Sequence, residues 1–277
     1  MRQVAIIIPT MDNRAYLEPC LDSLIANTTG IDYQIYVVNN GDPGSCAWMD
    51  PRVAILQAGG NIGWERALVL GLQASAEPRV LFLNDDVLFL RTQRHWLARL
   101  HEDLDEPGIA AAGPSSNMVA GPQSTTQQLP APRYSARYLI GFCLLIRRAA
   151  LDEVGGIDTG LPGGDDIDLS IRLRQAGYTL VCDRHAFVYH CGFRTGERVH
   201  GGPQVPGGWN SQQVINATTA ALIAKHGQTA FDEVWRNDPV CEYTAPDPQL
   251  AMYERLHAGG AALGKAIQEA REANKWR

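Results

Sequence analysis

Residues 79–89 read RVLFLNDDVLF, an apolar stretch interrupted by Asn84, Asp85 and Asp86. A short apolar run of this kind predicts a strand buried on both faces, here over residues 79–86. Asn-Asp-Asp alone is ordinary turn chemistry. Adjacent carboxylates at the end of a buried strand are also what a hard cation such as Mg²⁺ or Mn²⁺ prefers. The local sequence leaves both interpretations open.

The segments before this stretch alternate between strand and helix patterns. Strands are expected at 4–9, 33–41 and 52–57, and helices at 13–28 and 63–76. This alternation predicts an α/β fold, with a mostly parallel, Rossmann-like sheet flanked by helices. Ligands of such sheets bind beyond the carboxyl ends of the strands. The strand-end residues should therefore share one edge: Pro9, Thr10, Asn39, Asn40 and the trio 84–86.

The second half of the chain is less regular. Residues 107–136 are rich in Gly, Pro, Ser and Gln and predict a long loop. Further on, the patterns predict a strand entering a short helix at 137–151, a helix at 165–177, a strand at 179–190, a glycine-rich loop at 191–210, and C-terminal helices at 210–227 and 249–276. The last helices are expected to pack on the core or to form a homodimer.

Composition narrows the class of protein. The chain has 277 residues, 45% of them hydrophobic, with a formal net charge of -6 and a pI of about 5.6. This acidic balance lacks the excess of basic residues that is typical of nucleic-acid-binding proteins. The six cysteines have no zinc-site spacing, which suits a reducing compartment. We find no signal peptide and no run long enough for a membrane helix, and expect a cytoplasmic protein.

The motifs of the commonest parallel-sheet functions are absent from the sequence. The turn after the first strand reads PTMDNR, so the dinucleotide fingerprint G-x-G-x-x-G is missing there. The sequence also has no phosphate-binding P-loop and no G-x-S-x-G nucleophile elbow. What remains for chemistry is carboxylates.

A second acidic cluster begins the predicted helix at 165–177. Asp165, Asp166 and Asp168 fit an acidic first turn, which stabilises a helix N-terminus. A partly desolvated Asp at that position could equally serve as a general base. A lone His such as His190 is usually structural, but beside a metal at the sheet edge it would be a reasonable ligand.

Six motifs, in this order, resemble the GT-A-fold nucleotide-sugar glycosyltransferases of inverting family 2, especially the rhamnosyltransferase-like members. They lie between residues 4 and 192 and read VAIIIPTMDNRAYLEPCLDSL, VVNNGD, NIGWERALVLGL, LFLNDDV, GFCLLIRRAALDEVGGID and GDDIDLSIRLRQAGY. LFLNDDV is similar to the family's variant of the D-x-D motif. No Q-x-x-R-W motif is present, which argues against a processive polysaccharide synthase.

The resemblance implies roles for individual residues. Asp86 and His190 would bind a divalent metal, Mn²⁺ or Mg²⁺, and Asp166 would be the general base. Asp165 stands where Glu is commoner, so the two carboxylates could share or exchange roles. The implied donor-binding residues are Pro9, Thr10, Asn39, Asn40, Asn61, Gly63, Arg66, Asn84, Asp85 and Asp86. Loop composition alone leaves two interpretations of Arg194 and Arg198: a solvated basic loop, or closure of one of them over the diphosphate.

The resemblance also implies a function and a domain organisation. The expected reaction is inverting transfer of a sugar from a UDP-, dTDP- or GDP-sugar to a glycan, a lipid-linked sugar or another hydroxyl compound. A lipid-linked acceptor would place the protein at the inner membrane surface. The catalytic domain would span 1–200, with a donor half at about 1–90, an acceptor half at about 110–200 and a helical extension at 201–277. A retaining transferase and a non-catalytic sugar-nucleotide or glycan-binding protein are the alternatives.

Overall fold

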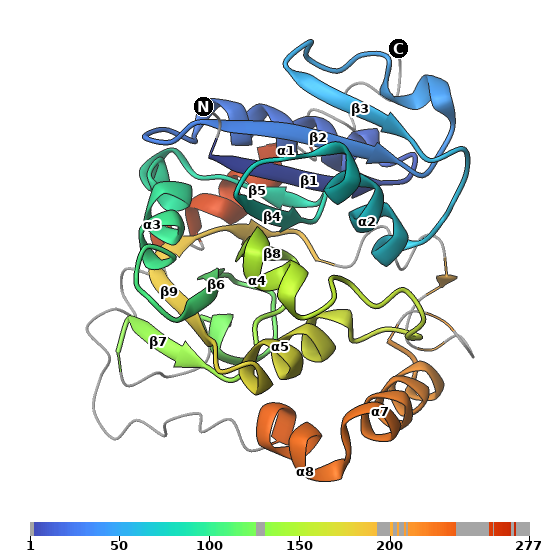
Figure 1. The fold of residues 1–277 in the computed structure, drawn as a ribbon. Coiled ribbons are helices and arrows are strands. Elements are labelled where there is room, and N and C mark those ends of the chain that lie inside the picture. Colours follow the sequence, from blue (N-terminus) through green and yellow to red (C-terminus); the bar gives the residue numbers. More distant parts are fainter. Residues whose placement is uncertain are drawn as a thin grey trace.

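An eight-stranded sheet forms the centre of the computed structural model, which describes residues 3–125, 131–192, 200–201, 204, 208, 210–236, 255–256, 258–266 and 269 (Figure 1). Its strand order is β3-β2-β1-β4-β8-β6-β9-β7. The strands are β1 (Val4–Thr10), β2 (Tyr33–Asn39), β3 (Val53–Gln57), β4 (Arg79–Leu83), β6 (Ile109–Ser115), β7 (Arg133–Ala136), β8 (Cys143–Arg147) and β9 (Thr179–Phe187). A second, two-stranded sheet pairs β5 (Val87–Leu88) with β10 (Tyr189–His190).

Helices cover both faces of the large sheet. The helices α1 (Arg14–Ala26) and α3 (Trp96–Asp103) pack on one face, and α2 (Trp64–Ala74), α4 (Arg148–Glu153) and α5 (Asp165–Gln175) pack on the other. Beyond α5 lie α7 (Gln212–His226) and α8 (Gln228–Phe231), at the end of the molecule away from β3 (Figure 1). The short helices are η1 (Pro43–Cys46), η2 (Arg91–Gln93), η3 (Gly121–Gln123) and the π-helical η4 (Asp232–Arg236).

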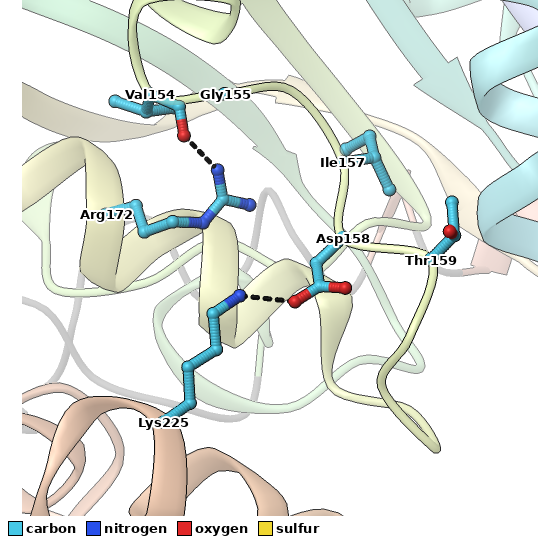
Figure 2. Close-up of a pocket in the computed structure, with 7 residues that line it drawn as sticks. All are labelled: Val154, Gly155, Ile157, Asp158, Thr159, Arg172 and Lys225. Atoms are coloured by element: carbon cyan, nitrogen blue, oxygen red, sulfur yellow. Dashed lines mark hydrogen bonds and ion pairs between the residues drawn. The ribbon is translucent and has the colours of Figure 1, made fainter.

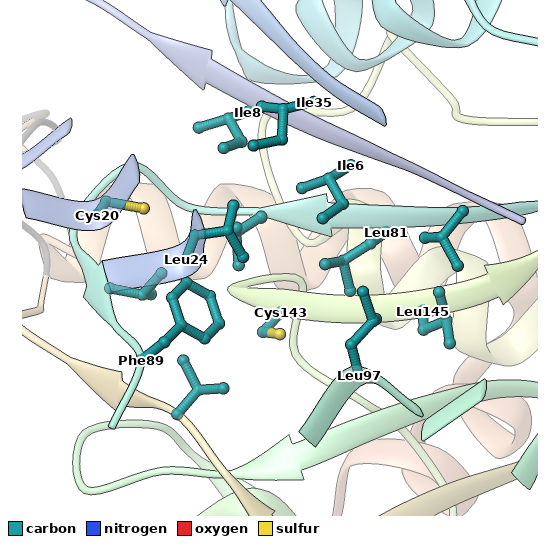
Figure 3. Packing of buried hydrophobic residues seen from close by; sticks show 14 of the residues in the cluster. Ile6, Ile8, Cys20, Leu24, Ile35, Leu81, Phe89, Leu97, Cys143 and Leu145 are labelled. Atoms are coloured by element: carbon teal, nitrogen blue, oxygen red, sulfur yellow. The ribbon is translucent and has the colours of Figure 1, made fainter. Parts of the chain in front are cut away.

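The strand β1 lies inside the core, as its apolar sequence predicts. All seven of its residues are buried. Side chains of a strand alternate between faces, so Ile6 and Ile8 pack with α1 and α3, whereas Ile7 packs with α2 (Figure 3). On the Ile7 side α2 approaches closely, because a Cβ built on Gly71 would lie 2.4 Å from Ile7 Cγ2. Only glycine fits there without a shift in the packing.

The predicted α/β fold class is confirmed. Within the large sheet, β3, β2, β1 and β4 are mutually parallel, and β6 is parallel to β9. The antiparallel ladders are β4–β8, β6–β8 and β7–β9, so four of the seven ladders are parallel. Because β1, β2 and β4 run in one direction, their carboxyl ends meet at one edge of the sheet.

Two segments differ from the sequence-based expectation. The predicted loop at 107–136 is wrong in part, because it contains β6 and β7. The sequence of β6 is IAAAGPS, and its small residues and proline are typical of loops. It forms a strand because it pairs with β8 and β9. The strand expected at 79–86 ends at Leu83, and the acidic trio forms the turn between β4 and β5.

The C-terminal region packs on the rest of the chain where it is described. Leu256 is buried with Leu90 and Phe187, and residues 258–266 are helical. A Cβ on Gly260 would lie 2.1 Å from the Tyr189 ring, so this helix lies directly against β10. Most of the glycine-rich loop falls outside the described residues. A homodimer, and a domain boundary near residue 200, stay predictions.

The described residues also bear on the expectations about membrane helices and cysteines. None of the described helices has the length and apolar character needed to cross a membrane. The five described cysteines are free thiols, four of them buried and Cys191 half-buried.

Candidate active site

The strand-end residues share one edge, as predicted from the topology. Thr10 at the end of β1 lies in register with Asn39 at the end of β2. The Asn40 amide donates to the Thr10 carbonyl at 2.8 Å, and Thr10 Oγ1 donates to Asp85 Oδ2 at 2.7 Å. Asp85 therefore ties the turn after β4 to the end of β1. Pro9 is buried within β1, paired with β2.

Asn39 organises the loop that follows β2. It is fully buried, and its Nδ2 donates to the Asp42 carbonyl at 2.8 Å and to Gln57 Oε1 at 3.0 Å. Its Oδ1 accepts the Gly41 amide at 3.0 Å. The side-chain amide is thus engaged within the protein, which gives Asn39 a structural role at the edge. Its contact with a donor stays a prediction.

The turn before α2 joins the same edge. Asn61 Oδ1 accepts the Gly63 amide at 3.0 Å, and Asn40 Nδ2 donates to the Gly63 carbonyl at 3.4 Å. Gly63 has φ of 86°, a left-handed conformation that favours glycine at this position. Arg66, in the first turn of α2, is exposed. Among the described residues, Asn40 Oδ1 is a buried acceptor without a hydrogen-bond donor.

Asp86 and His190, 104 residues apart in sequence, lie side by side at the end of β4. Antiparallel pairing of β5 with β10 sets His190 opposite Val87, and the Cys191 amide donates to the Asp86 carbonyl at 2.9 Å. His190 Nε2 lies 3.1 Å from Asp86 Oδ1, and both side chains are buried. Phe142 stacks on the imidazole, with ring centroids 5.2 Å apart.

A backbone carbonyl determines which nitrogen of His190 faces Asp86. Nδ1 lies 2.7 Å from the Met118 carbonyl, which can only accept, so Nδ1 carries the proton. Nε2 faces Asp86 Oδ1 and Asn84 Nδ2, 3.3 Å away, and hydrogen-bonds to Asp86 when the ring also carries a proton there. Burial would lower the pKa of His190, but the hydrogen bond and charge of Asp86 raise it above its ordinary value.

The Asp86–His190 pair fits a divalent metal. An octahedral ion with bonds of about 2.1 Å keeps adjacent ligands roughly 3 Å apart, and the two atoms are separated by 3.1 Å. The described residues contain no group of three or more His, Cys, Asp or Glu side chains able to hold a metal. Two protein ligands suit Mn²⁺ or Mg²⁺, whose remaining positions substrate phosphates and water commonly fill.

Asp165 and Asp166 begin α5 and differ in their hydrogen bonds. Asp166 accepts two backbone amides, from Gly141 at 3.1 Å and from Ile167 at 2.8 Å, whereas Asp165 accepts the Trp64 indole N–H at 3.1 Å. Burial raises the pKa of both, and the charge of Asp166 raises that of Asp165 further. Because two amide donors stabilise the ionised form of Asp166, its pKa is raised less than that of Asp165.

The sequence did not single out Trp64 and Glu65 as parts of this cluster. Burial raises the pKa of Glu65, with contributions from the charges of Asp158 and Asp166. The N-termini of α2 and α5 therefore bring three carboxylates together, and helix N-termini favour negative charge.

Asp168 has a different role from its two neighbours in the acidic cluster. It is fully buried, and its carboxylate lies 2.6 Å from Arg172, 2.5 Å from Lys225 and 2.7 Å from His226. Arg172 and Lys225 also line a pocket of about 360 Å³ together with the 154–159 loop (Figure 2). There Lys225 pairs with Asp158 at 2.5 Å and Arg172 donates to Val154 O at 2.6 Å. Asp168 thus joins α5 to α7.

Residues Gly141 and Phe142 connect the two candidate clusters. The Gly141 amide binds Asp166, Phe142 stacks on His190, and the Phe142 carbonyl accepts the Asn84 amide at 2.9 Å. The Asp86–His190 pair and the Asp165–Asp166 pair therefore lie on either side of this dipeptide at one edge of the sheet. Arg194 and Arg198 lie outside the described residues.

The mixed eight-stranded sheet with helices on both faces is the GT-A fold, as in solved glycosyltransferase structures that resemble it. The profile of "Glycosyl transferase family 2" matches residues 5–155, more than half of the sequence. The chain belongs to this family. Asp165, Asp166 and His190 lie beyond the matched segment.

Known proteins similar to the chain carry related names. It is 26% identical over 209 residues to the pre-mycofactocin glycosyltransferase of Mycobacterium tuberculosis (strain CDC 1551 / Oshkosh), covering 68% of this chain and 43% of that protein. It is 23% identical over 223 residues to the O-antigen biosynthesis protein RfbC of Myxococcus xanthus, covering 68% of this chain and 17% of that one. The match thus spans less than half of either relative.

A solved structure shares the fold. The mannosyltransferase PcManGT from Pyrobaculum calidifontis, in complex with GDP-Man and Mn²⁺, superposes with a TM-score of 0.57 at 18% sequence identity. The similarity covers 99% of this chain and 76% of that one.

Proposed function

We propose that the chain is an inverting glycosyltransferase that moves a sugar from a nucleotide-diphosphate sugar to an acceptor hydroxyl. The observation that carries the proposal is the placement of Asp86–His190 and Asp165–Asp166 on either side of Gly141 and Phe142. The first pair has the chemistry to hold a metal and a diphosphate, and the second has the chemistry to accept a proton. Family membership and the Mn²⁺ of the archaeal mannosyltransferase structure support this proposal.

Asp86 and His190 are the proposed ligands of the metal. Mn²⁺ or Mg²⁺ bound there would stabilise the negative charge on the leaving nucleoside diphosphate. The edge formed by Thr10, Asn40 and the turn before α2 would bind the nucleotide. The donor would be a UDP-, dTDP- or GDP-sugar.

Asp166 is the proposed general base. It would take the proton of the acceptor hydroxyl while that oxygen forms a bond to the anomeric carbon. The bond between that carbon and the diphosphate oxygen breaks, and its electron pair leaves with the diphosphate. Attack from the face opposite the leaving group inverts the anomeric centre. Asp165 would keep its proton, because burial and the charge of Asp166 raise its pKa by more than the Trp64 hydrogen bond lowers it.

Replacement of Asp166 by Asn tests the base. Turnover with donor and acceptor should fall by roughly two to four orders of magnitude, the usual contribution of a general base. Donor affinity should change little, because the Asn keeps the size of the side chain. Asp165→Asn is the matched control and should retain far more activity, since Asp165 is assigned the neutral form. Near wild-type turnover in Asp166→Asn, with substrates still bound, would refute the base assignment.

A thermal-shift screen of nucleotide sugars with and without Mn²⁺ would identify the donor. A bound donor stabilises the native state, so the correct sugar nucleotide should raise the melting temperature more in the presence of the metal. EDTA should abolish turnover and weaken donor binding. If turnover and donor affinity were unchanged by EDTA, the metal assignment would be wrong. NMR of the product anomer distinguishes inversion from retention, and donor binding with neither sugar transfer nor release of nucleotide would favour a non-catalytic binding protein.

A further inference from the structure

His190 lies on a strand too short to fix its position alone. The strand β10 has two residues, Tyr189 and His190, and within the described part of the chain it pairs with the equally short β5 alone. A two-residue ladder contributes few hydrogen bonds, and isolated two-stranded pairs are marginally stable. A side chain that must lie about 3 Å from a partner carboxylate needs further support.

Asn117 supplies this support to the main chain of His190. Its Nδ2 donates to the His190 carbonyl at 3.0 Å, and its Oδ1 accepts the His190 amide at 2.8 Å. These two bonds replace those of a neighbouring strand. The next residue, Met118, accepts Nδ1 of the imidazole through its carbonyl at 2.7 Å. Two consecutive residues thus hold both the backbone and the ring of His190.

The segment that carries Asn117 is anchored in the core. The Ser116 amide donates to the Gln123 carbonyl at 2.8 Å, and the Thr125 amide donates to the Ser116 carbonyl at 3.0 Å. Gln123 is fully buried, and its side chain bonds the Pro114 carbonyl at 3.2 Å and the Ile140 amide at 2.6 Å. Asn117 therefore projects from a rigid support.

We propose that Asn117 is a positioning residue, which fixes the main chain of His190 and thereby sets the affinity for the divalent metal. The inference rests on the metal role of His190 in the proposed function. An amide is required because the contact needs one donor and one acceptor on the same side chain. Asp can supply only the acceptor when ionised, and Ala supplies neither.

Titration with Mn²⁺ alone, followed by electron paramagnetic resonance of the free ion, tests the inference. Asn117→Ala and Asn117→Asp should weaken Mn²⁺ binding by about 10- to 100-fold, the usual effect of losing a residue that orients a metal ligand. His190→Ala should weaken it at least as much. Asn117→Ala added to His190→Ala should cause no further loss. Asn216→Ala, an exposed Asn on α7, is the matched control and should bind as wild type.

A second measurement needs no metal. Hydrogen exchange of the His190 backbone amide, followed by ¹H–¹⁵N NMR of metal-free protein, should be faster in Asn117→Ala, because Asn117 Oδ1 accepts that amide. The inference is overturned if Asn117→Ala keeps both wild-type Mn²⁺ affinity and wild-type amide exchange, or if it weakens binding equally with and without His190. If His190→Ala itself binds Mn²⁺ normally, the metal role of His190 fails instead, while the amide exchange still tests Asn117.

Discussion

Replacement of Asp168 by Asn should destabilise the protein strongly without touching the proposed chemistry. Asp168 is fully buried and faces the cations Arg172 and Lys225 as well as His226. The Asn side chain keeps the volume but removes the charge that compensates the two cations. Removing one partner of a buried ion pair costs about 3–5 kcal/mol. In Asp168→Asn, Lys225 keeps its ion pair with Asp158. We therefore expect a loss of unfolding free energy at the lower end of this range, about 3 kcal/mol.

This free energy converts into a measurable change in melting temperature. An unfolding entropy of about 2.1 cal/mol/K per residue gives roughly 0.6 kcal/mol/K for a chain of 277 residues. A loss of about 3 kcal/mol should therefore lower the melting temperature by about 5 °C. Differential scanning calorimetry at neutral pH would measure it. Asp158→Asn is the matched control, because it removes a partner of the same lysine at a site 34% exposed, and should cost less than about 1 kcal/mol.

The pH dependence gives an independent check on Asp168. Burial tends to raise its pKa, but hydrogen bonds from Lys225, Arg172 and His226 outweigh burial and hold the pKa below the ordinary 3.8. A lowered carboxylate pKa stabilises the fold above pH 3.8, and the stabilisation is lost as the pH falls through the folded-state pKa. The difference between wild type and Asp168→Asn should thus shrink below about pH 4. Equal melting temperatures for Asp168→Asn and wild type, or equal losses in both variants, would refute this account.

Two further predictions concern Asp103 and Gly41. Burial raises the pKa of Asp103 to about 6 despite its bond to Arg133, so its stabilising contribution, present below pH 3.8, is lost as the pH rises through 6. Urea unfolding from pH 4 to 7.5 would measure the free energy of unfolding, which should vary less with pH in Asp103→Asn than in wild type, by up to about 3 kcal/mol. Parallel pH profiles of the two proteins would contradict this. In Gly41→Ala the new Cβ would lie 2.1 Å from Asp12 Oδ1, which accepts the Asp42 amide. The clash would displace the loop after β2 at the edge proposed to bind the nucleotide, so nucleotide-sugar affinity should fall several-fold. Gly44→Ala, with its nearest atom at 3.2 Å, should bind normally in the same titration.

Local sequence patterns predicted the donor half of the fold well. The expected strand at 33–41 and helix at 63–76 became β2 and α2, each shorter by a few residues. These elements carry their own periodicity, so no distant partner is needed to recognise them. The strand β6 carries no such signal, because Ala and Gly residues fit a strand only when neighbouring strands pair with it.

The shared edge of the strand ends followed from topology, but the contact between Asp86 and His190 was predictable only through resemblance. Nothing in the local sequence around His190 indicates a contact with Asp86, which arises from the pairing of β5 with β10. Asn117 and Trp64 were missed because their roles depend on bonds to residues 73 and 101 positions away. Asn39 was expected to meet the donor, whereas its amide is engaged inside the loop after β2.

The pairing of β5 with β10 also has a consequence for biosynthesis. Asp86 leaves the ribosome 104 residues before His190, which at about 5–20 residues per second is a delay of roughly 5 to 20 s. During that interval the nucleotide edge of β1, β2 and β4 can assemble, while Asp86 has neither its histidine nor the strand that covers it. The nascent chain should therefore acquire the β1, β2 and β4 part of its sheet before it acquires the Asp86–His190 pair.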